Sequence, residues 1–253
     1  MAKSLGIATR FYGFAKGDTE RLATWVDAAL KIVSPEHIYI AIRTEVDKSG
    51  SLAYMRKYYP KVNTFAVMPW GRVVQAPNAL LLKAAENRES HLLFASSEYP
   101  VTKASVQLLF SHNDKDTLVV GSNLEGHDFQ AKKGRTVVVR HSNGLQIPWN
   151  TYALWSVAHL VHTGFVLTAD SAHDQNNAGM EEMGTIAAQQ ILWPNKAKAK
   201  LVNSHDATHV RNTRGWTVAR YERYAHNLES KRSRSAAQMA RLSLATPKVI
   251  HIG

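Results

Sequence analysis

The stretch HLLFASSEYPVT, residues 91–102, joins a run of apolar residues to a small polar cluster. His91–Ala95 is short and almost continuously apolar, which is typical of a strand buried on both faces. Ser96, Ser97 and Glu98 follow at once. We therefore predict a buried strand that ends at Ser96–Glu98 and carries these three side chains to one edge of a sheet.

The residues on either side of this stretch alternate between two patterns. Short runs rich in Ile, Val, Phe and Tyr predict strands, and longer runs with apolar residues at helical spacing predict helices. This alternation predicts an α/β, Rossmann-like domain with a mainly parallel central sheet and helices on both faces. The predicted strands are SLGIATRF (4–11), HIYIAIRT (37–44), VNTFAVMPW (62–70), HLLFASSE (91–98) and TLVVGSNL (117–124), and the predicted helices are TERLATWVDAALKIV (19–33), SLAYMRKYY (51–59), APNALLLKAAENR (76–88) and TKASVQLLFSH (102–112).

The second half of the chain has a less regular pattern. We predict one domain over residues 1–225, followed by a basic C-terminal helix and tail over residues 226–253. The elements predicted here are a turn and amphipathic helix in QIPWNTYALWSVAHLVHTGF (146–165), a helix that begins at two adjacent acids in NNAGMEEMGTIAAQQILW (176–193), a strand at AKAKLV (197–202) and a long basic helix in ARYERYAHNLESKRSRSAAQMARL (219–242).

The composition restricts the class of protein. The 253 residues are 45% hydrophobic, enough for one sizeable core, and none is cysteine, which excludes disulfides, thiolate metal sites and a thiol nucleophile. No apolar run approaches the roughly 20 residues of a membrane span, and the N-terminus does not have the pattern of a signal peptide. We therefore expect a soluble, cytoplasmic protein without a transmembrane segment. The net charge of +11 favours anionic partners.

Polar residues gather where ligands bind in such sheets, beyond the carboxyl ends of the strands. The common signatures of a P-loop, a dinucleotide-binding turn, a zinc protease helix and a nucleophile elbow do not occur in the sequence. Four features carry the remaining chemistry: Ser96-Ser97-Glu98, Arg43-Thr44-Glu45-Val46-Asp47, Gly179-Met180-Glu181-Glu182, and the pair His205 and His209.

The order of these features resembles the GT-A nucleotide-diphospho-sugar transferases, the fold of many family 2 glycosyltransferases, over roughly residues 5–210. In that family the fourth strand ends in an Asp-x-Asp motif, and Ser96-Ser97-Glu98 stands at its place. A later Gly-Gly-Phe segment is matched by Thr163-Gly164-Phe165, and an acidic motif that opens the next helix is matched by Glu181-Glu182. Arg43 stands where many relatives have Asp.

The resemblance implies a nucleotide-diphosphate sugar donor and a divalent metal, Mg²⁺ or Mn²⁺, that neutralises the leaving group. Glu98 would be the main anionic ligand of the metal, with His205 as a second candidate. From the residues alone, the alternative is that Glu98 caps the next helix through the turn at Thr102, and a His or Trp is more often a surface or core residue than a ligand. The candidate donor-binding residues are Arg10, Thr44, Glu45, Ser96, Trp149 and Asn150.

The resemblance also implies a general base. In an inverting transferase a carboxylate deprotonates the acceptor hydroxyl, and Glu182 aligns with that base, while Glu181 would orient the acceptor. The alternative is that both acids are ordinary first-turn residues, because the helix dipole favours carboxylates there. Whether the anomeric centre is inverted or retained stays open, as do the donor sugar and the acceptor.

Three hypotheses about function follow. The first is a metal-assisted glycosyltransferase that transfers a sugar from a nucleotide-diphosphate donor to an acceptor hydroxyl. The second is a catalytically degenerate GT-A domain that binds a nucleotide or a glycan, favoured by the single acid in Ser96-Ser97-Glu98. The third is a basic nucleic-acid or membrane-surface protein that contacts anionic surfaces through the C-terminal helix, although a solvated helix face would have the same composition.

Overall fold

The structure is a computed structural model that describes residues 4–13, 17–68, 74–99, 101–123, 129–131, 135–137, 152–161, 163–166 and 180–203. The predicted basic helix and the proposed division at residue 225 lie outside these residues. Within the described ranges, every helix is too short or too polar to cross a membrane.

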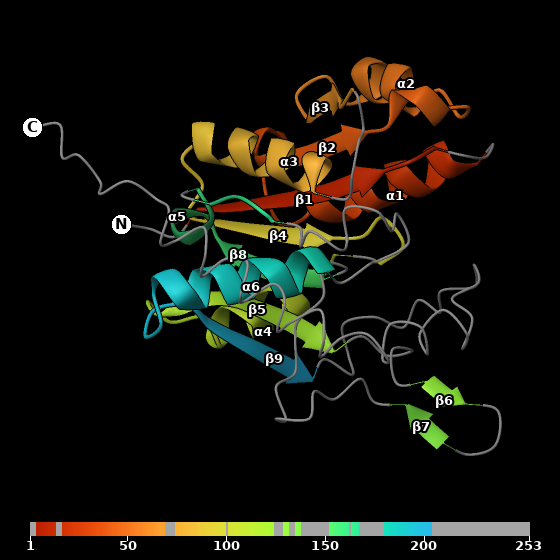
Figure 1. The fold of residues 1–253 in the computed structure, drawn as a ribbon. Helices are drawn as coiled ribbons and strands as arrows, with labels where there is room; N and C mark the ends of the chain where they lie inside the picture. The colour runs from red at the N-terminus through yellow and green to blue at the C-terminus, as the bar shows by residue number, and fades with distance from the viewer. Residues whose placement is uncertain are drawn as a thin grey trace, which may run out of the picture.

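A seven-stranded sheet forms the centre of the fold, in the order β3-β2-β1-β4-β8-β5-β9 (Figure 1). Pairing is parallel from β3 to β4 and between β5 and β9, and antiparallel on both sides of β8, so β8 alone runs against the other strands of this sheet. The strands are β1 (Leu5–Phe11), β2 (Ile38–Ile42), β3 (Asn63–Ala66), β4 (His91–Ala95), β5 (Thr117–Asn123), β8 (Tyr152–Ser156) and β9 (Lys198–Asn203).

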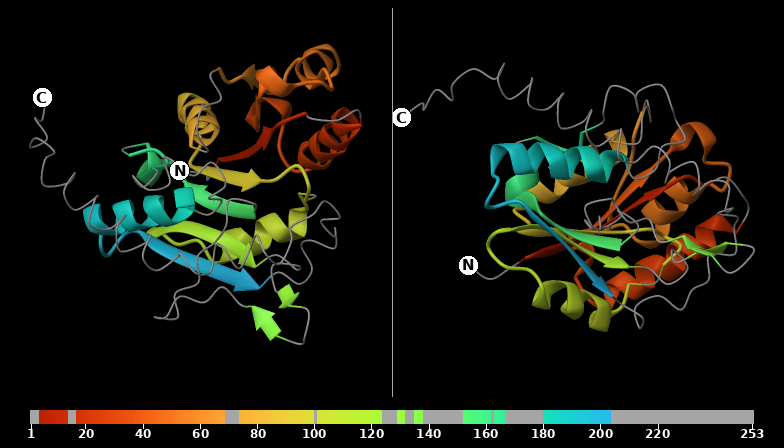
Figure 2. Two further views of the ribbon diagram at one scale, coloured as in Figure 1. Left: turned by 45° about the vertical axis from the view of Figure 1, so that its right-hand side comes forward. Right: turned by 60° about the horizontal axis from the view of Figure 1, so that its bottom comes forward.

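Helices cover both faces of the sheet (Figure 2). One face packs against α1 (Asp18–Leu30), α2 (Ser51–Tyr58) and α4 (Lys103–Ser111). The other face packs against α3 (Gln75–Glu86), α5 (Val157–Leu160) and α6 (Met180–Leu192). Both the predicted α/β class and the predicted layers are therefore confirmed.

The sequence of β2 explains why the sheet is covered twice. Ile38, Ile40 and Ile42 point to the face of α1, and Tyr39 and Ala41 point to the face of α3, and all five are fully buried. A strand that is apolar on both faces is stable only between two layers, because each buried aliphatic side chain contributes about 1.5–3 kcal/mol.

The prediction of a helix through residues 152–156 was wrong. Tyr152–Ser156 is the antiparallel strand β8, buried at every position, and only Val157–Leu160 is helical. The segment YALWS has no polar face of its own, so it fits the gap between β4 and β5, where both of its faces are covered. The short antiparallel pair β6 (Phe129–Ala131) and β7 (Arg135–Val137) was not predicted either.

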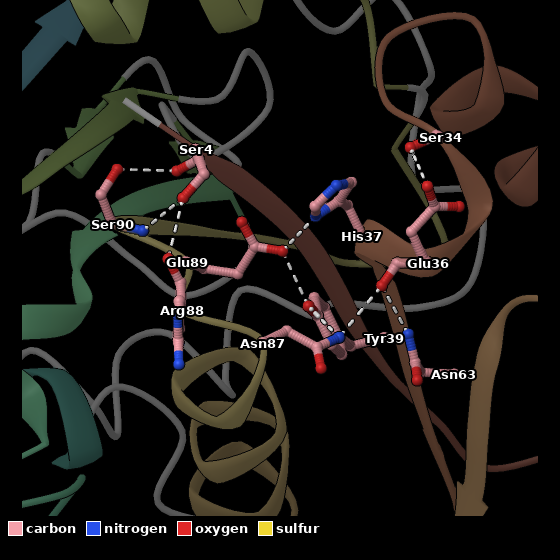
Figure 3. Close-up of polar contacts among 10 residues, drawn as sticks. All are labelled: Ser4, Ser34, Glu36, His37, Tyr39, Asn63, Asn87, Arg88, Glu89 and Ser90. Carbon is pink, nitrogen blue, oxygen red and sulfur yellow. Dashed lines mark hydrogen bonds and ion pairs between the residues drawn. The ribbon is translucent and has the colours of Figure 1, made fainter. Parts of the chain in front are cut away.

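A polar cluster lies at the edge of the sheet where β1, β2 and β4 begin (Figure 3). The Glu89 side chain is fully buried there, and its Oε1 accepts a hydrogen bond from the Tyr39 hydroxyl at 2.8 Å and contacts Nδ1 of His37. Burial, and then the hydrogen bond to Glu89, raises the pKa of Tyr39 well above its ordinary value. Gly6 leaves room for the Tyr39 ring, which would lie 2.7 Å from a Cβ at this position.

Candidate functional site

The carboxyl ends of β1, β2 and β4 lie side by side at the opposite edge of the sheet. Arg10 pairs in register with Ala41, and Ala8 pairs with Phe94, so the register of β1 and β4, continued by two residues, places Arg10 level with Ser96. The short 3₁₀ helix Thr44–Val46 follows β2 at the same edge. The topology therefore brings the predicted donor residues Arg10, Thr44, Glu45 and Ser96 to one edge.

The turn after β4 is held by its first serine. The backbone N–H of Tyr99 donates to the Ser96 carbonyl at 2.9 Å, and the N–H of Glu98 donates to Ser96 Oγ at 3.4 Å. The Glu98 side chain is half-buried. Ser96 thus shapes the turn that presents Glu98, in addition to any contact with a ligand.

Tyr99 anchors this turn in the core. It is 3% exposed and packs with the α1 and α4 layer. Burial, and to a smaller extent the neighbouring Glu98 charge, together raise the pKa of Tyr99 to about 12. The Glu98 carboxylate therefore disfavours ionisation of the Tyr99 phenol, because two negative charges would lie close together.

Helix α4 has its own cap, so it does not need Glu98 as one. Thr102 is the N-cap residue: its Oγ1 accepts from the Ser105 N–H at 3.1 Å, and Ser105 Oγ in turn accepts from the Thr102 N–H at 3.3 Å. The buried Tyr152 hydroxyl of β8 also contacts Ser105 Oγ. The capping role that the sequence also allowed for Glu98 is therefore performed by Thr102.

Two residues of opposite charge after β2, Arg43 and Glu45, contact each other. Arg43 Nε lies 3.6 Å from Glu45 Oε2, with both side chains about one-third exposed, so the pair contributes little stability, about 0–1 kcal/mol. The Thr44 hydroxyl is buried and has no hydrogen bond among the described residues. The Thr44 hydroxyl can therefore donate and accept a hydrogen bond at the end of β2, whereas the Glu45 charge is partly neutralised by Arg43.

Asp47 belongs to the segment 43–47 singled out from the sequence, where it received no role of its own, and its carboxylate organises this edge of the sheet. Its carboxylate accepts hydrogen bonds from Ser49 Oγ at 2.8 Å, the Ser51 N–H at 3.0 Å and the Leu52 N–H at 3.1 Å, and so caps α2. Gly13, at φ +63°, lies against it, since a Cβ there would be 2.5 Å from Asp47 Oδ1. The Asp-x-Ser-x-Ser spacing before a helical run is the signal that could have identified this cap.

The remaining predicted residues fall into two groups. Glu182 lies in the first turn of α6 and is 3% exposed, so the prediction of a helix starting at the two acids is confirmed. The side chain of Glu181, the residues Trp149 and Asn150, and His205 with its neighbour His209 lie outside the described part of the structure.

Few of the described side chains at this edge could bind a metal ion. Among the described residues, no three His, Asp or Glu side chains gather closely enough to form a metal site. Glu98 stands with the hydroxyls of Ser96 and Ser97 at the end of β4. One carboxylate with hydroxyl neighbours fits Mg²⁺ or Mn²⁺ only in the manner in which such ions bind nucleotides, with most ligands supplied by phosphate oxygens and water.

Comparisons with known proteins identify the fold. Neither a family model nor a curated protein matches the sequence. Among solved structures, the chain is similar to the mannosyltransferase PcManGT from Pyrobaculum calidifontis in complex with GDP-Man and Mn²⁺, with a TM-score of 0.54 and 10% identity over 96% of this chain and 76% of that chain. It is also similar to glucosyl-3-phosphoglycerate synthase from Mycobacterium tuberculosis in complex with Mg²⁺ and UDP, with a TM-score of 0.57 and 12% identity over 92% of this chain and 79% of that chain.

These similarities show a GT-A fold. The central sheet and its helical layers agree with those neighbours, as the order of motifs predicted. At 10–12% identity the likeness extends to the fold alone.

Proposed function

We propose that the protein is a glycosyltransferase that transfers a sugar from a nucleotide-diphosphate donor to an acceptor hydroxyl. The observation that supports this most is the convergence of three strand ends, with Arg10, Thr44 and the Ser96–Glu98 turn, at the edge where GT-A and other open α/β folds hold their ligands. The neighbours with the same fold include a mannosyltransferase bound to GDP-Man, which supports a nucleotide-sugar donor.

In this proposal the donor occupies the edge formed by β1, β2 and β4. The Arg10 guanidinium would pair with phosphate oxygens, because its planar, charged set of N–H groups matches them. The buried Thr44 hydroxyl would form a hydrogen bond with the nucleotide sugar. Glu45 and Ser96 would contact the nucleoside, and Trp149 and Asn150 would complete the sugar site.

Glu98 would hold a Mg²⁺ or Mn²⁺ ion shared with the diphosphate, with His205 as a further ligand. Such an ion neutralises the charge that develops on the leaving nucleotide. The role of the chain is to present one half-buried carboxylate at a fixed turn, which Ser96 and the anchored Tyr99 accomplish.

Glu182 would accept the proton of the acceptor hydroxyl as the oxygen attacks the anomeric carbon, and Glu181 would orient the acceptor. The place of Glu182 in the first turn of α6 supports this role, because the acidic motif of the transferases that the sequence resembles opens a helix in the same way. On a helix the two adjacent side chains point about 100° apart, so the two residues would have different roles.

The second candidate is a GT-A domain that binds a nucleotide or glycan without transferring a sugar. It is favoured by the single carboxylate in the Ser96–Glu98 turn and by the scarcity of acidic clusters among the described residues. A nucleic-acid or membrane-surface role rests on the net charge of +11 and on the basic sequence of residues 219–242.

Two variants and two assays separate these candidates. Binding of GDP and UDP, with and without Mn²⁺, would be measured by thermal shift, and sugar transfer from GDP- and UDP-sugars by release of the nucleotide. Glu182→Gln should lower transfer by about 10²- to 10⁴-fold and keep nucleotide affinity. Glu98→Gln should abolish the Mn²⁺-dependent part of the nucleotide affinity.

The matched control is Glu86→Gln. This carboxylate lies at the exposed end of α3 and forms an ion pair with Lys83. It should leave both assays unchanged. Nucleotide binding without transfer in the unmodified protein would favour the binding domain. Salt-sensitive binding to any polyanion, with no preference for nucleotides, would favour the third hypothesis.

A further inference from the structure

The segment between α5 and α6 is held by one side chain from α3. Asn78 Nδ2 donates to the Phe165 carbonyl at 3.0 Å, and the Phe165 N–H donates to Asn78 Oδ1 at 2.6 Å. Gly164, at φ +65°, makes this approach possible, since a Cβ there would lie 2.8 Å from Asn78 Oδ1. One amide therefore satisfies both backbone groups of Phe165, which only a side chain with a donor and an acceptor can do.

Phe165 is fixed by its ring as well. The ring is 2% exposed and makes edge-to-face contacts with Phe94 of β4, at 5.2 Å between centroids, and with Trp155 of β8, at 5.0 Å. The segment is thus pinned between α3 and the sheet, and its position relative to the strand ends is set by these contacts.

Helix α6 is attached to this segment by several contacts. The Val166 N–H donates to Thr185 Oγ1 at 3.1 Å, and Gly184 approaches so closely that a Cβ would lie 3.0 Å from the Val166 carbonyl oxygen. One turn later, Gln189 Nε2 donates to the His159 carbonyl at 3.1 Å and contacts the Thr163 hydroxyl. Both Thr185 and Gln189 are fully buried, so the helix cannot slide without breaking these bonds.

Glu182 shares the buried side of α6. It precedes Thr185 by three residues, a spacing that places two side chains on one helical face, and it is 3% exposed. The contacts therefore run from Asn78 through Phe165 and Val166 to Thr185, and from there along the helix to Glu182.

We infer that Asn78 is a positioning residue: it fixes the 163–166 segment and, through it, the first turn of α6 that carries Glu182. This inference rests on the proposed function for the role of Glu182 as base. The structural coupling between Asn78 and α6 does not depend on the proposed function, and it can be measured whatever the activity of the protein.

The test compares Asn78→Ala with Asn87→Ala, the same substitution at the two ends of α3. Asn87 donates to the Tyr39 hydroxyl at 2.9 Å and to the Glu36 carbonyl at 3.2 Å at the opposite edge of the sheet (Figure 3). Both variants lose an amide that makes two hydrogen bonds, so each controls for general destabilisation in the other. Hydrogen exchange and kinetics are recorded at equal intervals below each variant's Tm.

In Asn78→Ala, amide exchange in residues 163–166 and 180–192 should rise by on the order of tenfold, as expected for the loss of two hydrogen bonds. The value of kcat should fall by about 10- to 100-fold, the usual effect of a small displacement of a reacting group, while UDP and GDP affinity change less than about twofold. Asn87→Ala should change neither the exchange of these segments nor kcat.

Unchanged exchange in Asn78→Ala, or an equal rise in Asn87→Ala, would overturn the inference, as would a kcat loss shared by both variants. If the unmodified protein transfers no sugar, or if Glu182→Gln transfers normally, the proposed function or its base is wrong. The exchange comparison still decides whether Asn78 positions α6.

Discussion

Tyr99 links the candidate site to the core through one ionisable group. Its pKa is raised to about 12, first by burial and then by the Glu98 charge, from an ordinary value near 10. Below pH 10 the phenol is protonated in the folded and the unfolded chain. Between pH 10 and 12 the unfolded chain releases this proton while the folded chain retains it, so ionisation favours unfolding.

We therefore predict that Tyr99 makes the free energy of unfolding fall by about 2 kcal/mol between pH 10 and 12, since the slope in this range is at most about 1.4 kcal/mol per pH unit. Urea unfolding at pH 9, 10, 11 and 12 would measure this. Other tyrosines titrate in the same range, so the quantity to follow is the difference between the unmodified protein and Tyr99→Phe. Parallel pH profiles for the two proteins would contradict the prediction.

Residues such as Asp47 and Asn78 mark the limit of what the sequence predicted at this scale. Asn78 acts on a backbone group 87 residues away, which no local pattern reports. Asp47 caps the helix that follows it, and only its spacing from Ser49 and Ser51, not the apolar periodicity, signals this contact. By contrast, Ser96–Glu98 could be placed because it ends an apolar run, and the end of a buried strand is readable from local composition. The roles of these three residues in binding a donor stay a prediction.

Among the elements, the strands and helices up to residue 123 were predicted well because each has one dominant pattern. Strand β8 was not, because four of the five residues of YALWS are apolar or aromatic, and such a short run fits a buried helix or a buried strand equally. The neighbouring strands decide the matter: His91 pairs with Ser156, and Val120 pairs with Leu154, so β8 fills a gap that no local signal reveals.

Helix α4 provides a test at the scale of one element. The capping box of Thr102 and Ser105 satisfies backbone groups in the turn between Glu98 and the helix. We predict that Thr102→Ala lowers the free energy of unfolding by about 1 kcal/mol, the usual cost of removing a capping oxygen. Urea unfolding checks the value, with Thr102→Ser as the control that keeps the hydroxyl. A loss of the same size in both variants would show that the cap does not depend on this oxygen.

At the scale of the whole molecule, the two edges of the sheet carry different kinds of polar residues. The edge at the strand ends holds the candidate donor residues, whereas the edge at the strand starts holds the buried Glu89 with His37 and Tyr39 (Figure 3). The Glu89 Oε2 atom is buried and accepts no hydrogen bond among the described residues. The carboxylate therefore depends on the contacts of its other oxygen.

Removal of His37 should consequently destabilise the protein without affecting ligand binding. We predict that His37→Ala lowers the free energy of unfolding by about 1–3 kcal/mol, the cost of removing one of the two partners of a buried carboxylate, with the lower end favoured because His37 is itself 35% exposed and the Tyr39 hydroxyl remains. Nucleotide affinity should stay within about twofold, because the cluster and the candidate site lie at opposite edges and effects of distant sites are largely independent.

The matched control is His112→Ala, an exposed histidine after α4, which should leave stability unchanged. Urea unfolding and thermal shift with UDP or GDP measure both quantities on the same samples. A weakened nucleotide affinity in His37→Ala, after correction for the lower Tm, would show that the two edges are coupled, and equal stability of the two variants would show that Glu89 does not need its histidine.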